Sequence, residues 1–222
     1  MHARTETLEQ KYLAPGKIIV FIELLIGYGL IMASVWTIGP IQRVWFRIAA
    51  VWFLLSAVLA MFRKDLPSPK LPSLRLITGI FGLTLFVVVL TVAPAAALGT
   101  LHGLFGTKDP LMHASMYVLW AFVQQYIQQA FFFARLEQIT RNGLLAGFSA
   151  AALFGLAHIP NPILAPVTFL GGWILSEIYR RWRSIIPLGI AHGLIGIAIA
   201  ISVPDALHHH MRVGMGYLYY PY

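Results

Sequence analysis

Long apolar runs separated by short polar segments dominate the chain. Most runs hold about 20 residues, the length that an α-helix needs to cross a hydrocarbon core of about 30 Å. The runs cover residues 18–38, 44–62, 76–98, 111–135, 144–158, 163–179 and 185–203. Because backbone polar groups in lipid must be satisfied within the segment, the pattern predicts an all-α, polytopic transmembrane bundle of six to eight spans, most simply seven. The fifth run is short and would also suit a re-entrant segment.

Polar residues divide the chain into a short head, a bundle and a short tail. Residues 1–16 form a mixed-charge segment that we expect in the cytoplasm, ending at Pro15-Gly16. Residues 17–203 form the transmembrane bundle, and residues 204–222 form an aromatic, histidine-bearing tail. No polar stretch is long enough to fold separately, so we expect a single domain.

The basic residues predict the orientation of the bundle. Of the 16 Lys and Arg residues, twelve lie in the N-terminal segment or in the loops that would share its side of the membrane. Four of them belong to the proline-broken segment 63–75, between the second and third runs. Because Lys and Arg are enriched in cytoplasmic loops, we expect the N-terminus in the cytoplasm and, with seven spans, the C-terminus outside.

Composition narrows the classes of function. The 222 residues are 59% hydrophobic and 11% charged, with a mean hydropathy of +0.75 and a net charge of +8. The basic residues lie in short loops rather than in one patch, which argues against a nucleic-acid partner. The chain contains no cysteine, which excludes disulfides, a thiolate nucleophile and cysteine-ligated zinc.

Four glutamines near the end of the fourth run stand out against their apolar surroundings. They are Gln124, Gln125, Gln128 and Gln129. Such side chains are expensive at membrane depth unless they face a bundle interior or a wet cavity. At 3.6 residues per turn, Gln125 and Gln128 share one stripe with Phe132 and Arg135, and the other two glutamines flank it. One glutamine is explained by interhelical hydrogen bonding, but four within six residues indicate a polar functional cavity.

Among the charged residues in the apolar runs, Arg135 and Glu23 are candidates for a role in the site. Arg135 stands at the expected cytoplasmic end of the fourth run, where it suits a helix anchor as well as a site residue. Glu23 lies inside the first run and could pair with an arginine or accept a hydrogen bond from a glutamine.

A histidine and an asparagine close the fifth run. Phe154 precedes His158 by one helical turn, and Asn161 follows between two prolines. The alternative to a site histidine is a satisfied histidine at a helix end. Proline-broken backbone at membrane depth usually lines a cavity, so the segment favours a site containing His158 and Asn161.

His192 lies in the middle of the seventh run, where an ionisable residue suggests function. Gly189, Gly193 and Gly196 surround it and would let another helix approach closely. We expect His192 and His158 to converge with Gln125 and Gln128 inside the membrane.

Taken in order, these motifs resemble the CPBP family, which includes type II CAAX prenyl proteases and bacteriocin-processing and immunity membrane proteins. The family carries a Glu-Glu pair followed by arginine, then Phe-x-x-x-His, then His-x-x-x-Asn or Asp. Phe154 and His158 match the second motif, and the resemblance covers about residues 115–200. It implies a helical membrane bundle, and it favours a bacterial cytoplasmic membrane.

The chain departs from this family at the residues that carry catalysis. Gln128-Gln129 replaces the glutamate pair, Arg135 stands six residues beyond it rather than four, and Gly196 replaces the final Asn or Asp. In the family the glutamate is thought to activate water, but an amide cannot accept a proton near neutral pH. Glu137 is a poor substitute, because nine residues place it on the opposite helix face from Gln128.

Three functions remain open at this point. The first is a divergent intramembrane peptidase, or another chemistry in the same cavity, with candidate catalytic residues His158, His192, Gln128, Gln129 and Arg135. The second is a non-catalytic or immunity-type protein that binds a membrane peptide, protein, isoprenoid or lipid through the cavity. Its candidate binding residues are Gln124, Gln125, Phe154 and Asn161.

The third function is a metal-dependent membrane enzyme. His158 and His192 would hold a divalent metal such as Zn or Fe, which imidazole ligands suit. The tail also carries His208-His209-His210, a run that is more typical of a solvated or headgroup-facing patch than of a metal site.

Overall fold

The computed structural model describes residues 3–63, 72–104 and 108–220, and within these ranges the secondary structure is helical with no strand. The elements are α1 (Ala3–Val35), α2 (Gly39–Arg63), α3 (Leu74–Ala97), α4 (Pro110–Gln125), η2 (Tyr126–Phe133), α5 (Ala134–Thr140), α6 (Gly143–Leu156), α7 (Leu164–Trp182), α8 (Ile186–Ser202), α9 (Asp205–His208) and α10 (Gly214–Tyr219). The all-α prediction is confirmed. Much of the predicted basic segment 63–75 lies outside the described residues.

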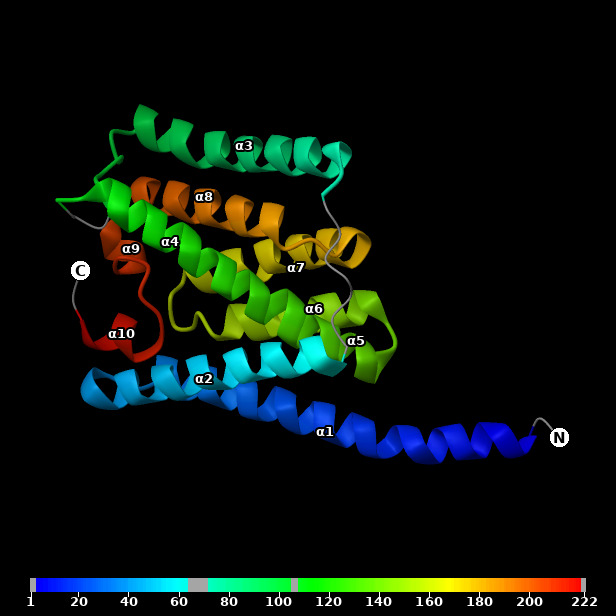
Figure 1. The fold of residues 1–222 in the computed structure, drawn as a ribbon. Helices are drawn as coiled ribbons and strands as arrows, with labels where there is room; N and C mark the ends of the chain where they lie inside the picture. Colours follow the sequence, from blue (N-terminus) through cyan, green and yellow to red (C-terminus); the bar gives the residue numbers. More distant parts are fainter. Residues whose placement is uncertain (1–2, 64–71, 105–107, 221–222) are drawn as a thin grey trace.

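The helices stack in layers around the fourth run (Figure 1). The hairpin of α1 and α2 covers one side, and α3 packs against α8 on the other. Between them, α4 packs against α8, and α6 packs against α7. This order places η2, which continues α4, in contact with α2, α6 and α7.

From α2 to α8 the helix boundaries lie within about five residues of the apolar runs. Three segments are long and apolar enough to cross a membrane: Gly16–Val35, Gly39–Ala60 and Leu74–Ala97. The helices α6 and α8 are apolar but shorter. The number of spans therefore stays a prediction.

The predicted break at Pro15-Gly16 is wrong, because α1 continues through this pair. Proline removes a single helical hydrogen bond, so the helix continues past Pro15 with the other backbone groups in helical geometry.

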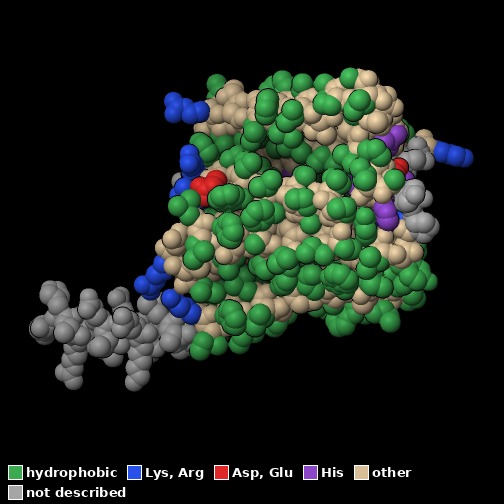
Figure 2. All heavy atoms as spheres, turned by 180° about the vertical axis from the view of Figure 1, so that it is seen from behind, with side chains coloured by type: hydrophobic (Ala, Val, Ile, Leu, Met, Phe, Trp, Pro, Cys, Tyr) green, Lys and Arg blue, Asp and Glu red, His purple; other side chains and the backbone are tan. Residues whose placement is uncertain are grey.

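The aromatic centre of the bundle comes from η2 itself. Phe131, Phe132 and Phe133 are buried, and Phe131 meets Phe53 of α2 edge-to-face at 4.9 Å. Large apolar side chains also cover the outside, as Figure 2 shows. Apolar residues on both the inside and the outside are what lipid surroundings require.

Charge is distributed unevenly between the two ends (Figure 2). Most visible Lys and Arg side chains gather at one end of the molecule, and histidines gather at the opposite end. The basic end includes the ion pairs Arg180–Glu177 and Arg183–Glu137, 2.9 and 2.8 Å long. The predicted orientation, with the basic end in the cytoplasm, stays a prediction.

The tail folds back onto the bundle through hydrogen bonds. Asn161 Nδ2 donates to the carbonyls of His208 and Arg212, both at 2.9 Å, and the Gly214 amide donates to Ile159 at 3.0 Å. Gly214 has φ +54, and a Cβ there would collide with Val35 of α1. The tail thus closes one end of the helical layers.

Candidate functional site

The glutamines lie where the fourth helix widens from α to π. In η2 the backbone hydrogen bonds run between residues five apart, an arrangement that is rare and frequent at functional sites. Every side chain from Gln128 to Arg135 is buried. The predicted stripe assumed a period of 3.6, which turns only every third or fourth residue inward. It is corrected here, because every residue of this stretch is buried and no single face carries the polar side chains.

Three of the glutamines form one hydrogen-bonded chain. Ser176 Oγ donates to Gln129 Oε1 at 3.2 Å, and Gln129 Nε2 donates to Gln125 Oε1 at 3.3 Å. Gln125 Nε2 then donates to Gln128 Oε1 at 3.3 Å and to His192 Nδ1 at 3.0 Å. Because an amide nitrogen only donates, His192 accepts at Nδ1 and its neutral ring carries the proton on Nε2.

Glycines on α8 bring His192 close to the glutamines. A Cβ at Gly193 would lie 2.9 Å from Val118, and one at Gly189 would lie 2.5 Å from Phe122, both on α4. The predicted close helix approach is therefore present. Gly196 packs against Tyr117, so the Asn or Asp of the family pattern would not fit at this position without a shift.

A single aromatic ring joins the two histidines. Phe154 lies edge-to-face with His158 at 4.7 Å and with His192 at 5.8 Å between ring centroids. His158 Nδ1 lies 2.6 Å from the Phe154 carbonyl, which can only accept. The proton of neutral His158 is therefore on Nδ1, and Nε2 carries the lone pair.

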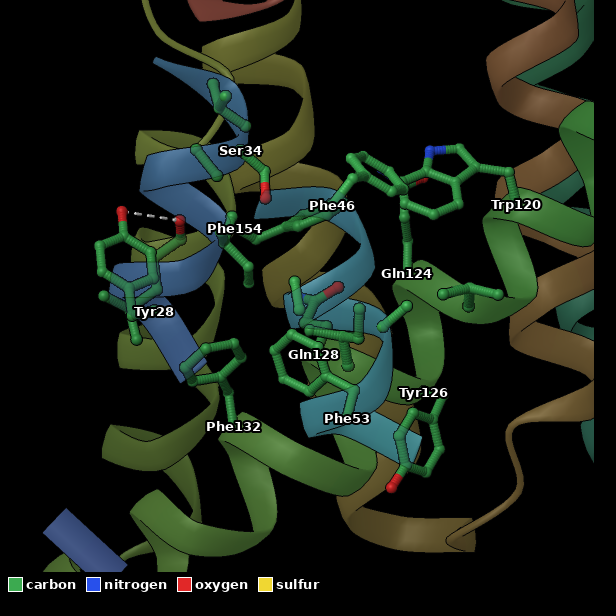
Figure 3. A pocket seen from close by; sticks show the side chains of 18 of the residues that line it. Tyr28, Ser34, Phe46, Phe53, Trp120, Gln124, Tyr126, Gln128, Phe132 and Phe154 are labelled. Carbon is green, nitrogen blue, oxygen red and sulfur yellow. Dashed lines mark hydrogen bonds between the residues drawn. The ribbon is translucent and has the colours of Figure 1, made fainter. Parts of the chain in front are cut away.

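A cavity of about 580 Å³ borders this network (Figure 3). Its wall is mostly apolar and aromatic, and its polar lining residues include Gln124, Gln128 and His158. Tyr28 also lines it and donates to the Leu153 carbonyl at 3.3 Å. No carboxylate is among the described residues that line the cavity.

Gln128 is the glutamine with an unused donor. Its side chain is 1% exposed, and its Nε2 has no hydrogen-bond partner among the described atoms. A Cβ on Gly172 would lie 2.5 Å from this nitrogen and 3.2 Å from Phe154. In Figure 3 Gln128 lies among the aromatic rings of the cavity.

Arg135 points to a different place. Its Nε donates to Glu23 at 2.8 Å and its Nη2 to Ser56 at 2.7 Å, and its guanidinium stacks 3.9 Å from the Phe131 ring centroid. These groups border a separate cavity of about 130 Å³. The pairing considered for Glu23 is confirmed, and Arg135 ties α5 to α1 and α2 rather than joining the histidines.

Two other polar residues are also engaged outside the cavity. Glu137 pairs with Arg183 at 2.8 Å. The Asn161 carboxamide is filled by its two bonds to the tail and by the amides of Ile163 and Leu164 at 3.1 and 2.9 Å, so it holds the turn together.

Sequence reasoning missed Ser176 and Gly172, both on α7. Ser176 is fully buried and begins the glutamine chain, and Gly172 makes room for Gln128. A serine within an apolar helix was a detectable signal, whereas nothing in the sequence reveals which side chain a glycine accommodates. For the predicted His158–His192 metal site, no third His, Asp or Glu joins the pair within the described part of the chain.

Comparison with known families agrees with this geometry. Residues 106–198 match the family model described as Type II CAAX prenyl endopeptidase Rce1-like, and this range includes the four glutamines and both His158 and His192. The resemblance inferred from the motifs is confirmed. No curated protein and no solved structure matches the chain.

Proposed function

We propose that the cavity binds a membrane-embedded amphiphile and does not cleave it by a glutamate mechanism. The premise is an integral membrane protein that lies in a lipid bilayer and has an Rce1-like core. The ligand carries a long apolar chain and a hydrogen-bond acceptor such as a carbonyl, as a lipid, an isoprenoid conjugate or a membrane peptide does. The protein is multi-pass in a bacterial cytoplasmic membrane, with its N-terminus in the cytoplasm.

The unused donor of Gln128 carries this proposal. A buried N–H without a partner costs about 1–3 kcal/mol, and a ligand acceptor in the adjoining cavity would recover that cost. The remaining wall is apolar, which suits a hydrocarbon chain. Glutamines occupy the positions of the family's paired glutamates, and neither can take a proton from water.

A second candidate function is histidine-based chemistry in the same cavity. His158 lines the cavity, and its bond to the Phe154 carbonyl leaves Nε2 free of a proton. A neutral imidazole is a suitable proton acceptor near physiological pH. Under this second function the protein would change the ligand chemically, whereas under the first it would only bind it.

Photocrosslinking in native membranes tests the binding proposal. The probe is a fatty-acyl ester carrying a diazirine and an alkyne, compared with the same chain lacking the carbonyl. We expect the ester to label the protein more strongly, and Gln128→Leu to reduce labelling about three- to tenfold, the value of one hydrogen bond of about 1 kcal/mol.

Two neighbouring glycines give the matched control. Gly172→Ala pushes on Gln128 and should reduce labelling, whereas Gly171→Ala meets nothing within 4 Å and should not. Equal labelling by both probes, or by Gln128→Leu and the native protein, would refute the proposal. Recovery of a chemically altered probe, dependent on His158, would favour the second candidate.

A further inference from the structure

A cluster of ligand-type side chains lies outside the cavity, at the histidine-rich end of the molecule. His102 lies between α3 and α4, while Asp205 and His208 belong to α9. One potential ligand atom from each of the three lies within 4.8 Å of the other two. His102 Nδ1 is 3.9 Å from Asp205 Oδ2, and His208 Nδ1 is 3.8 Å from Asp205 Oδ1.

Several of these atoms are buried without a hydrogen bond. Asp205 Oδ1 and His210 Nδ1 lie only 2.9 Å apart, yet neither has a hydrogen-bond partner among the described atoms. His208, beside them, is fully buried. Buried polar atoms in native proteins are normally hydrogen-bonded or bound to an ion, so Asp205 Oδ1 and His210 Nδ1 can still take up a bound ion.

His102 has the second interaction that metal-binding histidines usually make. Its Nε2 lies 2.9 Å from the Val203 carbonyl, closer than the 3.2 Å between its Nδ1 and the Gly103 carbonyl. A neutral ring donates only once, and donation at Nε2 leaves the Nδ1 lone pair for a metal. A backbone carbonyl that holds the other nitrogen fixes tautomer and ring orientation.

We propose that His102, Asp205 and His208 bind a divalent transition metal, with His210 as a fourth ligand. Metal–nitrogen bonds of about 2.1 Å place neighbouring ligand atoms roughly 3–3.5 Å apart. The distances of 3.9 and 3.8 Å from Asp205 to His102 and His208 must therefore shorten on binding, and the 2.9 Å between Asp205 and His210 must lengthen slightly. Imidazole with one carboxylate suits zinc or cobalt. His208 Nδ1 accepts from the Met211 amide at 3.1 Å, and binding exchanges this bond for a metal bond.

The metal would fasten the tail to the connection between α3 and α4. The same tail contributes Met211 and Val213 to the wall of the large cavity. The site is thus a structural one that fixes the end of the cavity, separate from the glutamines and from His158 and His192.

Cobalt titration of the full-length protein tests this site. The protein is purified in detergent with a tag that contains no histidine, stripped with a chelator, and titrated with CoCl₂ while visible absorption is recorded. We expect one equivalent to bind with the d–d bands of a protein-ligated site, ZnCl₂ to displace it, and His102→Ala or Asp205→Asn to weaken binding at least tenfold.

Two histidine variants serve as controls for cobalt that binds at histidines outside the proposed site. His113→Ala removes a histidine of α4, and His209→Ala removes the middle of the histidine run. Both should bind cobalt as the native protein does. Absence of binding by the native protein, or unchanged binding in His102→Ala, would overturn the proposal, and so would an equal loss in His209→Ala, because each places the metal elsewhere.

Discussion

Gln125 connects the two halves of the buried polar site through one carboxamide. It accepts from Gln129 and donates to both Gln128 and His192. Since a carboxamide has only these capacities, its orientation fixes that of its neighbours, and it also fixes the tautomer of His192.

Replacing Gln125 by leucine should therefore destabilise the protein. Gln128, Gln129 and His192 each lose a partner, and such a loss costs about 1–3 kcal/mol for a buried group, although membrane hydrogen bonds often contribute less, about 0.6 kcal/mol on average. Unfolding in mixed detergent would measure the loss. The control is Gln124→Leu, at a half-buried neighbour. Equal stability of the two variants would contradict the network.

The two glutamines that replace the family's glutamates should not be equivalent. In the native protein Gln129 Nε2 donates to Gln125 Oε1, so Gln129→Glu would place two acceptor oxygens opposite each other. Gln128 Nε2 has no partner, so Gln128→Glu loses no hydrogen bond there. We expect Gln129→Glu to be less stable than Gln128→Glu by about 1–3 kcal/mol, measured in the same unfolding assay. The reverse order would show that the donor assignment is wrong.

The histidines and Glu137 should also differ in function. We expect His158→Ala or His192→Ala to abolish any activity or ligand labelling, because both rings border Phe154 and the cavity network. Glu137→Gln should leave it nearly intact, since Glu137 pairs with Arg183 instead. Full function in both histidine variants, at normal accumulation, would leave the site structural.

At the scale of elements, the contact between α4 and α8 determines where His192 lies. The contact depends on glycines of α8 that admit α4 side chains, and at Gly193 even the backbone of Val118 is close, 3.1 Å from an added Cβ. Backbone cannot yield as a flexible side chain can, so this position is sensitive to one methyl group.

Gly193→Ala should consequently separate α4 from α8. Overpacking costs about 1–3 kcal/mol, and the shift should also weaken the bond between His192 and Gln125. Stability measured by unfolding, with photocrosslinking as the functional readout, would detect both effects. Gly79→Ala on α3, which meets nothing within 4 Å, is the matched control. The two variants behaving alike would rule out the packing argument.

At the scale of the molecule, the orientation follows from the separation of charge. The basic end carries the C-terminus of α7, and the opposite end carries α9 and its histidines. If the positive-inside rule holds, the tail and the cluster around His102 face the outside of the cell.

Cysteine labelling tests this orientation cleanly, because the native chain has no cysteine. A membrane-impermeant maleimide should label Gly103→Cys in intact cells and should label Arg181→Cys only after permeabilisation; both positions are exposed. Labelling of both variants from the same side would show that the predicted span assignment is wrong.

The sequence by itself determined the helical class, the approximate helix boundaries, the resemblance to the CPBP family and three polar residues that line the cavity, Gln124, Gln128 and His158. These properties depend on local hydrophobicity, on spacing and on residue chemistry, all of which can be read along a chain. The absence of ionisable residues at Gln128 and Gln129 was equally visible. So was the unusual number of glutamines in one apolar run.

Only the tertiary structure decided which partner each polar group finds. Arg135 meets Glu23 and Asn161 holds the tail, because polar groups in an apolar setting are stabilised by a partner and only the fold decides which one lies within reach. Asp205 likewise lies beside His102, about a hundred residues away along the chain. The π-helical turn was equally hidden, since a 3.6-residue period assumes the hydrogen-bond pattern that η2 does not follow.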